Sequence, residues 1–327
     1  MKKYLPFVER FRPKNLEDVV SHDNTIKLLR KFITTHNIPH LLFYGPPGTG
    51  KTSTIESFVN ELYGEENVEY MTMNINASEE RGIDVVRSKI ANFARTCPVY
   101  MYKHQNHKIP NYKFIILDEA DAMTYDAQAT LRKVMETYTF NTRFCLICNH
   151  IKSIDDAIKS RCVTIKFGPM QYKSVETKIQ DISRIIGVNV TEDGINAIWK
   201  LSNGDMRKIM HMLQIISINY KTITADVVTN FQKYPTAQEI NMLYTTLSKK
   251  QFNSSVETFR ALVKNKFYSL HEILTELAEL LIKLIVEKKI FVKKGIYMLT
   301  KLRDIEMNIV TTSDTDIQLC AIVSIFI

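Results

Sequence analysis

The sequence predicts an α/β domain with a parallel five-stranded sheet in the first half of the chain, followed by a helical region. Five short apolar runs alternate with helical patterns in that half. Continuous apolar runs of this length are typical of strands buried on both faces of a parallel sheet. They lie at residues 41–44, 70–75, 114–117, 144–148 and 163–167. After Gln171 strand signals nearly vanish and helical periodicity takes over.

The first apolar run leads directly into a glycine-rich loop. Residues 45–52 read G-P-P-G-T-G-K-T, and apolar residues at helical spacing follow over residues 55–62. The glycines let backbone N–H groups point at phosphate oxygens, and Lys51 supplies a positive charge to the outer phosphates. The Thr52 hydroxyl is placed for Mg²⁺. The pattern therefore predicts a nucleoside triphosphate site at a helix N-terminus.

The third apolar run ends in carboxylates, at the D-E-A-D of residues 118–121. Asp118 would hold Mg²⁺ directly or through water, and Glu119 would orient and polarise the attacking water. Taken alone, this tetrapeptide could equally be a solvated turn. Because it follows a buried strand in a chain that has a phosphate loop, a hydrolytic role is favoured.

Composition and charge set outer limits on the class of protein. The 327 residues suffice for two or three domains, and 45% hydrophobic with 24% charged residues is typical of an ordered, helix-rich protein. The net charge of +8 is compatible with a polyanionic partner, but many solvated surfaces are equally basic. No apolar stretch reaches the length of a membrane span and no signal-peptide pattern opens the chain, so an intracellular protein without a membrane partner is expected.

Five cysteines at irregular spacing argue against a disulfide framework and suit a reducing compartment. Cys145 and Cys148 form a C-x-x-C pair that could belong to a zinc site. The surrounding apolar run, and the lack of a second ligand pair after it, favour a buried strand instead.

Domain boundaries are predicted where the alternation of apolar runs and helical patterns breaks. Gly168 and Pro169 end the α/β rhythm. Residues 175–186, residues 193–201 and the segment after Gly204 then read as helices, and residues 232–236 read as a linker. Further amphipathic helices follow, the clearest at residues 270–285. Their apolar stripes could serve an internal core or subunit packing, and the internal core is the commoner use.

Several motifs in this order resemble the small subunits of replication factor C, the AAA+ clamp loader of eukaryotic and archaeal DNA replication. The motifs are G-P-P-G-T-G-K-T-S at residues 45–53, L-D-E-A-D at 117–121, S-R-C at 160–162 and G-D-M-R at 204–207. Residues 5–13 resemble the N-terminal box of the family, and residues 76–87 resemble its second-strand signature. The match runs from the N-terminus to about Arg207 and continues weakly through the helical tail.

The resemblance implies three domains and a mechanical function. An AAA+ P-loop nucleotide-binding domain would span residues 1–168, a helical lid domain 169–232, and a helical collar domain 233–327 that joins a heteropentameric ring. With ATP and Mg²⁺ as cofactors, the ring would open a proliferating cell nuclear antigen (PCNA)-type sliding clamp. It would load that clamp on primer–template DNA in replication and repair, which places the chain in the nucleus.

The resemblance also assigns roles to single residues. Val8 and Arg12 would lie against the adenine base, and Val20 would line the same pocket. The phosphates would be wrapped by Gly45, Pro46, Pro47, Gly48, Thr49, Gly50, Lys51, Thr52 and Ser53, with Thr52 and Asp118 on Mg²⁺. Asn149 matches the sensor that contacts the γ-phosphate or the lytic water, a role that suits an amide because it both donates and accepts. Without the resemblance, Asn149 could be a turn residue at the end of a strand.

Two arginines receive different roles. Arg161 matches a finger that reaches the triphosphate on the neighbouring subunit and stabilises charge in phosphoryl transfer. Sequence alone would favour an ordinary surface arginine at this position. Arg207 matches a second sensor, which links the γ-phosphate to the position of the lid.

Contacts with DNA are expected where helix N-termini and basic side chains meet phosphates without reading bases. The candidates are Arg81, Ile83, Arg87, Arg132 and Lys133. Arg132 and Glu136 are spaced i,i+4, so a surface ion pair is the alternative for that arginine. Residues 96–102 are expected to face the clamp, or else to be a helix end packed on its own domain.

Two rival functions share the nucleotide site. An AAA+ helicase or branch-migration motor would need loops that translocate DNA, and the S-R-C motif with the N-terminal box argues against it. The other rival is a structural subunit that binds ATP without hydrolysing it. All of Lys51, Asp118, Glu119 and Arg161 are present, which favours a hydrolysing subunit.

Overall fold

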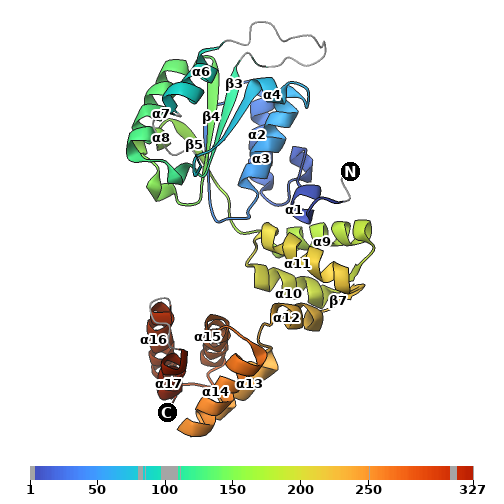
Figure 1. The fold of residues 1–327 in the computed structure, drawn as a ribbon, viewed down its shortest axis with the longest axis vertical. Coiled ribbons are helices and arrows are strands. Elements are labelled where there is room, and N and C mark those ends of the chain that lie inside the picture. The colour runs from blue at the N-terminus through green and yellow to red at the C-terminus, as the bar shows by residue number, and fades with distance from the viewer. Residues whose placement is uncertain are drawn as a thin grey trace. The chain divides into compact units, whose positions relative to one another are not determined.

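The computed structural model describes residues 4–79, 84, 86–96, 110, 112–249, 251–309 and 315–326, and of residues 87 and 315 the side chains are not described. The chain divides into two compact units, Met1–Ile223 and Thr224–Ile327. Figure 1 shows the elements of each. The three-domain division at residues 168 and 232 stays a prediction.

The first unit is built on a parallel five-stranded sheet with the strand order β2-β3-β4-β1-β5. Its strands are β1 (His40–Tyr44), β2 (Thr72–Asn76), β3 (Lys113–Asp118), β4 (Thr142–Cys148) and β5 (Cys162–Lys166). Each strand overlaps one of the predicted apolar runs, which confirms the α/β class. Because the strands are parallel, their carboxyl ends meet at one edge of the sheet, where open α/β folds place their ligands.

The strand expected at residues 70–75 is only partly correct. Tyr70 and Met71 belong to the short helix α4 (Val68–Met71), and β2 begins at Thr72. The backbone N–H groups of Tyr70 and Met71 both donate to the carbonyl of Asn67, at 3.2 and 3.0 Å. A short apolar run does not by itself distinguish a strand from a buried helical turn.

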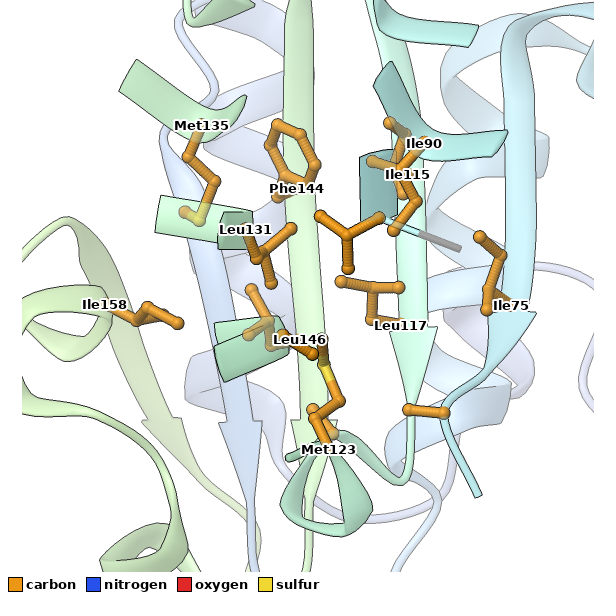
Figure 2. Packing of buried hydrophobic residues seen from close by; sticks show 14 of the residues in the cluster. Ile75, Ile90, Ile115, Leu117, Met123, Leu131, Met135, Phe144, Leu146 and Ile158 are labelled. Atoms are coloured by element: carbon orange, nitrogen blue, oxygen red, sulfur yellow. The ribbon is translucent and has the colours of Figure 1, made fainter. Parts of the chain in front are cut away.

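Helices cover both faces of this sheet (Figure 1). One face carries α2 (Asp23–Thr35), α3 (Lys51–Tyr63) and α4, and the other carries the π-helical turn η3 (Val86–Ile90), α6 (Ala91–Arg95), α7 (Tyr125–Tyr138) and α8 (Asp156–Lys159). Figure 2 shows Phe144 and Leu146 of β4 on the α7 side, packed with Leu131 and Met135. Burial on both faces explains why the strands are continuous apolar runs.

The C-x-x-C pair lies within β4, as predicted for a strand, and both cysteines are buried. Cys145 packs in the apolar cluster on the α3 side of the sheet, whereas Cys148 packs in the cluster on the α7 side. Since alternate residues of a strand face opposite sides, two thiols three residues apart cannot share one metal ion here.

His40, at the start of β1, makes the stability of the fold depend on pH. Its side chain is buried, and its Nδ1 accepts a hydrogen bond from the Phe144 N–H at 3.2 Å. Burial, and to a smaller extent the nearby positive charge of Arg143, lower the pKa of His40 from 6.5 to about 4. Between these values the unfolded chain binds a proton that the folded chain excludes. Stability is therefore retained above pH 6.5 and lost as the pH falls towards 4.

We expect the His40→Gln variant to lose less stability than the wild type between pH 6.5 and pH 4, by up to about 3 kcal/mol. Glutamine has an oxygen that can accept the Phe144 N–H bond, but it takes up no proton. Urea unfolding at several pH values measures the difference. The exposed His211, changed to Gln, is the matched control, and an identical pH slope for wild type and His40→Gln would contradict the assignment.

The rest of the first unit is mainly helical, as predicted. It contains α9 (Tyr172–Ile186), α10 (Glu192–Ser202) and α11 (Met206–Asn219), with a two-residue parallel pair of strands, β6 (Asn189–Val190) and β7 (Thr222–Ile223). Asp205 is the N-cap of α11, because its carboxylate accepts the backbone N–H groups of Arg207 at 2.8 Å and Lys208 at 3.3 Å. This cap fixes Arg207 in the first turn of the helix.

The second unit is helical throughout its described residues. It contains α12 (Ala225–Gln232), α13 (Ala237–Ser248), α14 (Phe252–Lys266), α15 (Leu270–Val286), α16 (Val292–Ile309) and α17 (Thr315–Phe326). The predicted apolar stripe of α15 is largely internal, since Ile273, Leu277 and Leu281 are fully buried. Large apolar side chains also remain exposed here, with Val286 at 75% and Phe291 at 88%.

Within the residues described, none of the helices combines the length and the apolar character that crossing a membrane requires.

Candidate nucleotide-binding site

The loop after β1 has a backbone that only glycine fits. Gly45, Gly48 and Gly50 have positive φ values of 151°, 69° and 87°. A Cβ at Gly45 would lie 2.0 Å from the carbonyl oxygen of Phe167, and one at Gly48 would lie 1.7 Å from Oδ1 of Asp205. The glycines thus permit both the turn and the close approach of neighbouring segments.

Lys51 opens helix α3 and is 7% exposed. Its ammonium donates to the carbonyls of Gly45 and Pro46, both at 2.7 Å, and to Oδ1 of Asn149 at 3.0 Å. Burial lowers the pKa of Lys51, while the negative charge of Asp118 opposes this effect. Lys51 and Asn149, predicted for one site, are therefore in direct contact.

Thr52 and Asp118 are also brought together. The Thr52 hydroxyl donates to Oδ2 of Asp118 at 2.8 Å. The next residue, Glu119, has a left-handed backbone with φ of 53°, and its N–H donates to Oδ1 of Asp118 at 2.9 Å. This conformation turns the chain from the end of β3 into the 3₁₀ turn η4 (Ala120–Ala122).

A cavity of about 160 Å³ lies at this edge of the sheet. The predicted residues that line it are Val8, Arg12, Val20, Pro47, Gly48, Thr49, Gly50, Lys51, Thr52, Ser53, Asp118, Glu119, Asn149 and Arg207. Gly45 and Pro46 contribute the carbonyls that hold Lys51. One cavity therefore collects residues from the N-terminal segment, the glycine-rich loop, two strand ends and α11.

Sequence reasoning missed other residues of the cavity wall. These are Glu9, Phe11, Pro13, Val19, Met170, Lys178, Met206 and Met210. The two methionines of α11 carried a usable signal. Met206 directly precedes Arg207 in the sequence, and Met210 lies one turn further along, on the same helix face as Met206. Lys178 comes from α9, and its position depends on packing that no local pattern reports.

The N-terminal segment is tied to the phosphate-loop helix through Arg12. Val8 lies in the short helix α1 (Phe7–Arg10), and Arg12 follows it before the turn η2 (Leu16–Asp18). Arg12 pairs with Glu56 of α3 at 2.9 Å and with Glu9 at 3.5 Å. Burial raises the pKa of Glu56, and the positive charge of Arg12 offsets part of that rise.

Helix α11 touches the glycine-rich loop directly. The backbone N–H of Met206 donates to the carbonyl of Gly48 at 3.0 Å, beside the close approach of Asp205 to Gly48. Further along the helix, Oε1 of Gln214 accepts the Phe7 N–H at 2.9 Å. The segment that carries Arg207 is thus bonded both to the loop and to the N-terminal helix.

Arg161 does not line the cavity. It lies between α8 and β5, and its guanidinium donates to Oε1 of Glu136 at 2.5 Å and to the carbonyl of Ala157 at 2.6 Å. The Arg161 side chain is 39% exposed. The partner Glu136 was not foreseen, because the sequence suggested Arg132 as its partner.

The candidate DNA contacts are only partly covered by the structure. Arg81 and Ile83 lie outside the described residues, and so do residues 97–102 of the expected clamp segment. Arg87 belongs to η3 by its backbone, and its side chain is not described. Arg132 and Lys133 lie on α7, and neither forms an ion pair with any residue that the structure describes. The alternative ion pair of Arg132 with Glu136 is not formed, because Glu136 binds Arg161 instead.

The residues present fit a nucleoside triphosphate with a divalent cation. The glycines leave a cradle that a Cβ would obstruct, and the free N–H groups at the start of α3 suit phosphate oxygens. A hydroxyl and a carboxylate, from Thr52 and Asp118, meet at 2.8 Å beside it. Oxygen ligands of this kind are those that Mg²⁺ prefers.

Two family models match the chain. The model described as ATPase family associated with various cellular activities (AAA) matches residues 41–169. The model of the replication factor C C-terminal domain matches residues 235–324.

Relatives match over most of the sequence. Replication factor C subunit 5 of Mus musculus is 37% identical over 323 residues, which cover 98% of this chain and 91% of that protein. Replication factor C subunit 3 of Schizosaccharomyces pombe is 39% identical over 320 residues, covering 98% and 90%. Replication factor C subunit 2 of Saccharomyces cerevisiae is 45% identical over 214 residues, covering 65% and 61%.

Among solved structures, the RuvB Holliday junction branch migration motor of Thermotoga maritima superposes with a TM-score of 0.54. The alignment covers 82% of this chain and 91% of that chain at 14% sequence identity. At this identity the likeness shows the fold alone.

Proposed function

The chain belongs to the replication factor C family of small clamp-loader subunits, and from this premise we propose that its cavity is one of several ATP sites shared between neighbours in a ring. Family membership makes it an ATPase subunit of a hetero-oligomeric clamp loader in DNA replication. The observation that carries the proposal is the convergence of Lys51, Asp118, Glu119, Asn149 and Arg207 on a single cavity.

Within that cavity we assign binding to the glycine-rich loop and hydrolysis to the strand ends. Lys51 would give up one or more of its three present acceptors to bind phosphate oxygens, and Val8, Arg12 and Val20 would enclose the base. Mg²⁺, held by Thr52 and Asp118, would neutralise phosphate charge. Glu119 would orient the attacking water, and Asn149 would contact the γ-phosphate or that water.

Arg207 would report nucleotide state to the helical lid of residues 169–232. Its helix is bonded to the glycine-rich loop through Met206 and Gly48. A guanidinium on this helix that also binds the γ-phosphate would make the lid angle depend on whether ATP or ADP is present. The proposed boundaries at residues 168 and 232 enclose this moving part.

Arg161 would act on the ATP of the neighbouring subunit. Its position outside the chain's own cavity supports an action in trans. Its side chain is accessible, and its three protein acceptors, on Ala157, Ser160 and Glu136, do not use all five N–H donors of a guanidinium. The remaining donors can face a phosphate group across a subunit boundary.

The proposed partners are the other loader subunits in a pentamer, a PCNA-type clamp and primer–template DNA, in the nucleus. Exposed apolar residues of the collar, residues 233–327, such as Val286 and Phe291, support subunit packing. Arg132 and Lys133 on α7 are unpaired cations among the described residues, which supports contact with DNA phosphates. Arg81, Ile83 and Arg87 remain part of the same proposal.

The ATPase rate of the purified complex tests this function against its rivals. We expect the rate to rise with the clamp, with primer–template DNA, and most with both. Changing Glu119 to Gln should lower hydrolysis at this site by about 10²-fold while ATP still binds. A branch-migration motor would need no clamp, and a purely structural subunit would lose no activity on Glu119→Gln.

A further inference from the structure

Asp121, the last residue of the D-E-A-D motif, has no part in the proposed chemistry, yet it touches the backbone that carries Asn149. It lies within the 3₁₀ turn η4, which begins directly after the left-handed residue Glu119. That turn directs the chain from the end of β3 towards the end of the neighbouring strand β4. Asp121 therefore lies between the two strand ends that supply the hydrolytic residues.

A single carboxylate oxygen of Asp121 accepts two backbone hydrogen bonds. The N–H groups of Asn149 and His150 both donate to Oδ2, each at 3.2 Å. These residues follow the last ladder position of β4, where Cys148 pairs with Tyr44, and precede the 3₁₀ turn η5 (Ile151–Ser153). Neither the sheet nor the turn supplies an acceptor for these two donors, so Asp121 fixes the backbone at this point.

The side chain of Asn149 then has a defined orientation. Its Oδ1 accepts a hydrogen bond from the Lys51 ammonium at 3.0 Å, and an ammonium can only donate. The amide oxygen therefore faces Lys51, which leaves Nδ2 to donate from the cavity wall. A donor at this position suits an oxygen of the terminal phosphate.

We infer that Asp121 is a positioning residue, which holds the backbone of Asn149 so that its amide discriminates a triphosphate from a diphosphate. This inference rests on the proposed role of Asn149 as a phosphate sensor. Asp121 acts through its hydrogen-bond acceptor, since the two N–H bonds set the angle from which the Asn149 side chain leaves the backbone. A competing explanation is that Asp121 acts through its charge, beside Asp118 and Glu119.

Four variants of the full-length chain separate these explanations: Asp121→Ala, Asp121→Asn, Asn149→Ala and the double variant Asp121→Ala with Asn149→Ala. The readout is the ratio of dissociation constants for ADP and a slowly hydrolysed ATP analogue with Mg²⁺, measured by calorimetry. Asp126→Ala is the matched control, since this exposed aspartate lies in the first turn of α7, close to Asp121 in the sequence.

We expect Asp121→Ala to lose about tenfold in preference for the triphosphate, with ADP affinity unchanged. A loss of this size corresponds to the removal of one or two hydrogen bonds to a charged group. Asp121→Asn keeps an acceptor oxygen and should retain most of the preference. The double variant should be no worse than Asn149→Ala alone, because Asp121 acts only through Asn149.

Four results would overturn the inference. If Asn149→Ala loses the preference and Asp121→Ala keeps it, the sensor role stands and the positioning role fails. If Asp121→Asn loses as much preference for the triphosphate as Asp121→Ala, the carboxylate acts by its charge. If the losses of Asp121→Ala and Asn149→Ala add in the double variant, Asp121 does not act through Asn149. If Asn149→Ala itself keeps the preference, the sensor role fails first and the positioning role with it.

Discussion

Replacing Lys51 with alanine is expected to abolish nucleotide binding by this chain, lowering its affinity for ATP with Mg²⁺ by about 100-fold or more. Lys51 is the buried cation of the glycine-rich loop, and its ammonium makes three hydrogen bonds to groups around the phosphate cradle. Alanine removes the charge and the donors that would bind the outer phosphates. Calorimetric titration of ATP and ADP measures the loss.

The exposed Lys27 of α2, changed to alanine, controls for the removal of one positive charge. Melting temperatures with no nucleotide added should show that the Lys51→Ala chain is folded. An affinity within tenfold of the wild type would mean that backbone N–H groups alone hold the phosphates, and the role given to Lys51 would be wrong.

The sequence was sufficient for the fold class because the strands are buried on both faces. Continuous apolar runs and the loop after the first of them predicted the five strands and the edge of the sheet that carries the site. The strand predicted for residues 70–75 was wrong at its N-terminal end, because apolar character alone does not distinguish a strand from a helical turn. The two-residue strands β6 and β7 are too short to leave any periodicity.

The functional residues were predictable where they sit in local motifs, and their partners were not. Glu56 anchors Arg12 across 44 positions, Asp121 bonds the backbone of Asn149 across 28, and Glu136 binds Arg161 across 25. Each pair forms only because the strands and helices pack as they do. For Glu136 the local rule predicted Arg132, four residues away, and the tertiary contact with Arg161 prevailed.

Changing Arg161 to alanine is expected to leave this chain's own nucleotide affinity within about twofold and to slow hydrolysis on the neighbouring subunit by about 10³-fold. The guanidinium lies outside the chain's own cavity, so its removal leaves the binding residues intact. Arg161→Lys should rescue little, because an ammonium lacks the planar fork that binds two phosphate oxygens. Lys159→Ala, two residues away, is the matched control for lost charge.

Whether each ATP site is shared between two subunits is decided by a paired measurement on the Arg161→Ala variant. Nucleotide affinity is measured on the isolated chain. ATPase rate is measured in the complex with Lys51→Ala also present, so that this chain's own site is silent. If the site is shared, the affinity stays unchanged and the ATPase rate of the complex falls further. A large loss of affinity in the isolated chain, or an unchanged rate in the complex, would contradict a shared site.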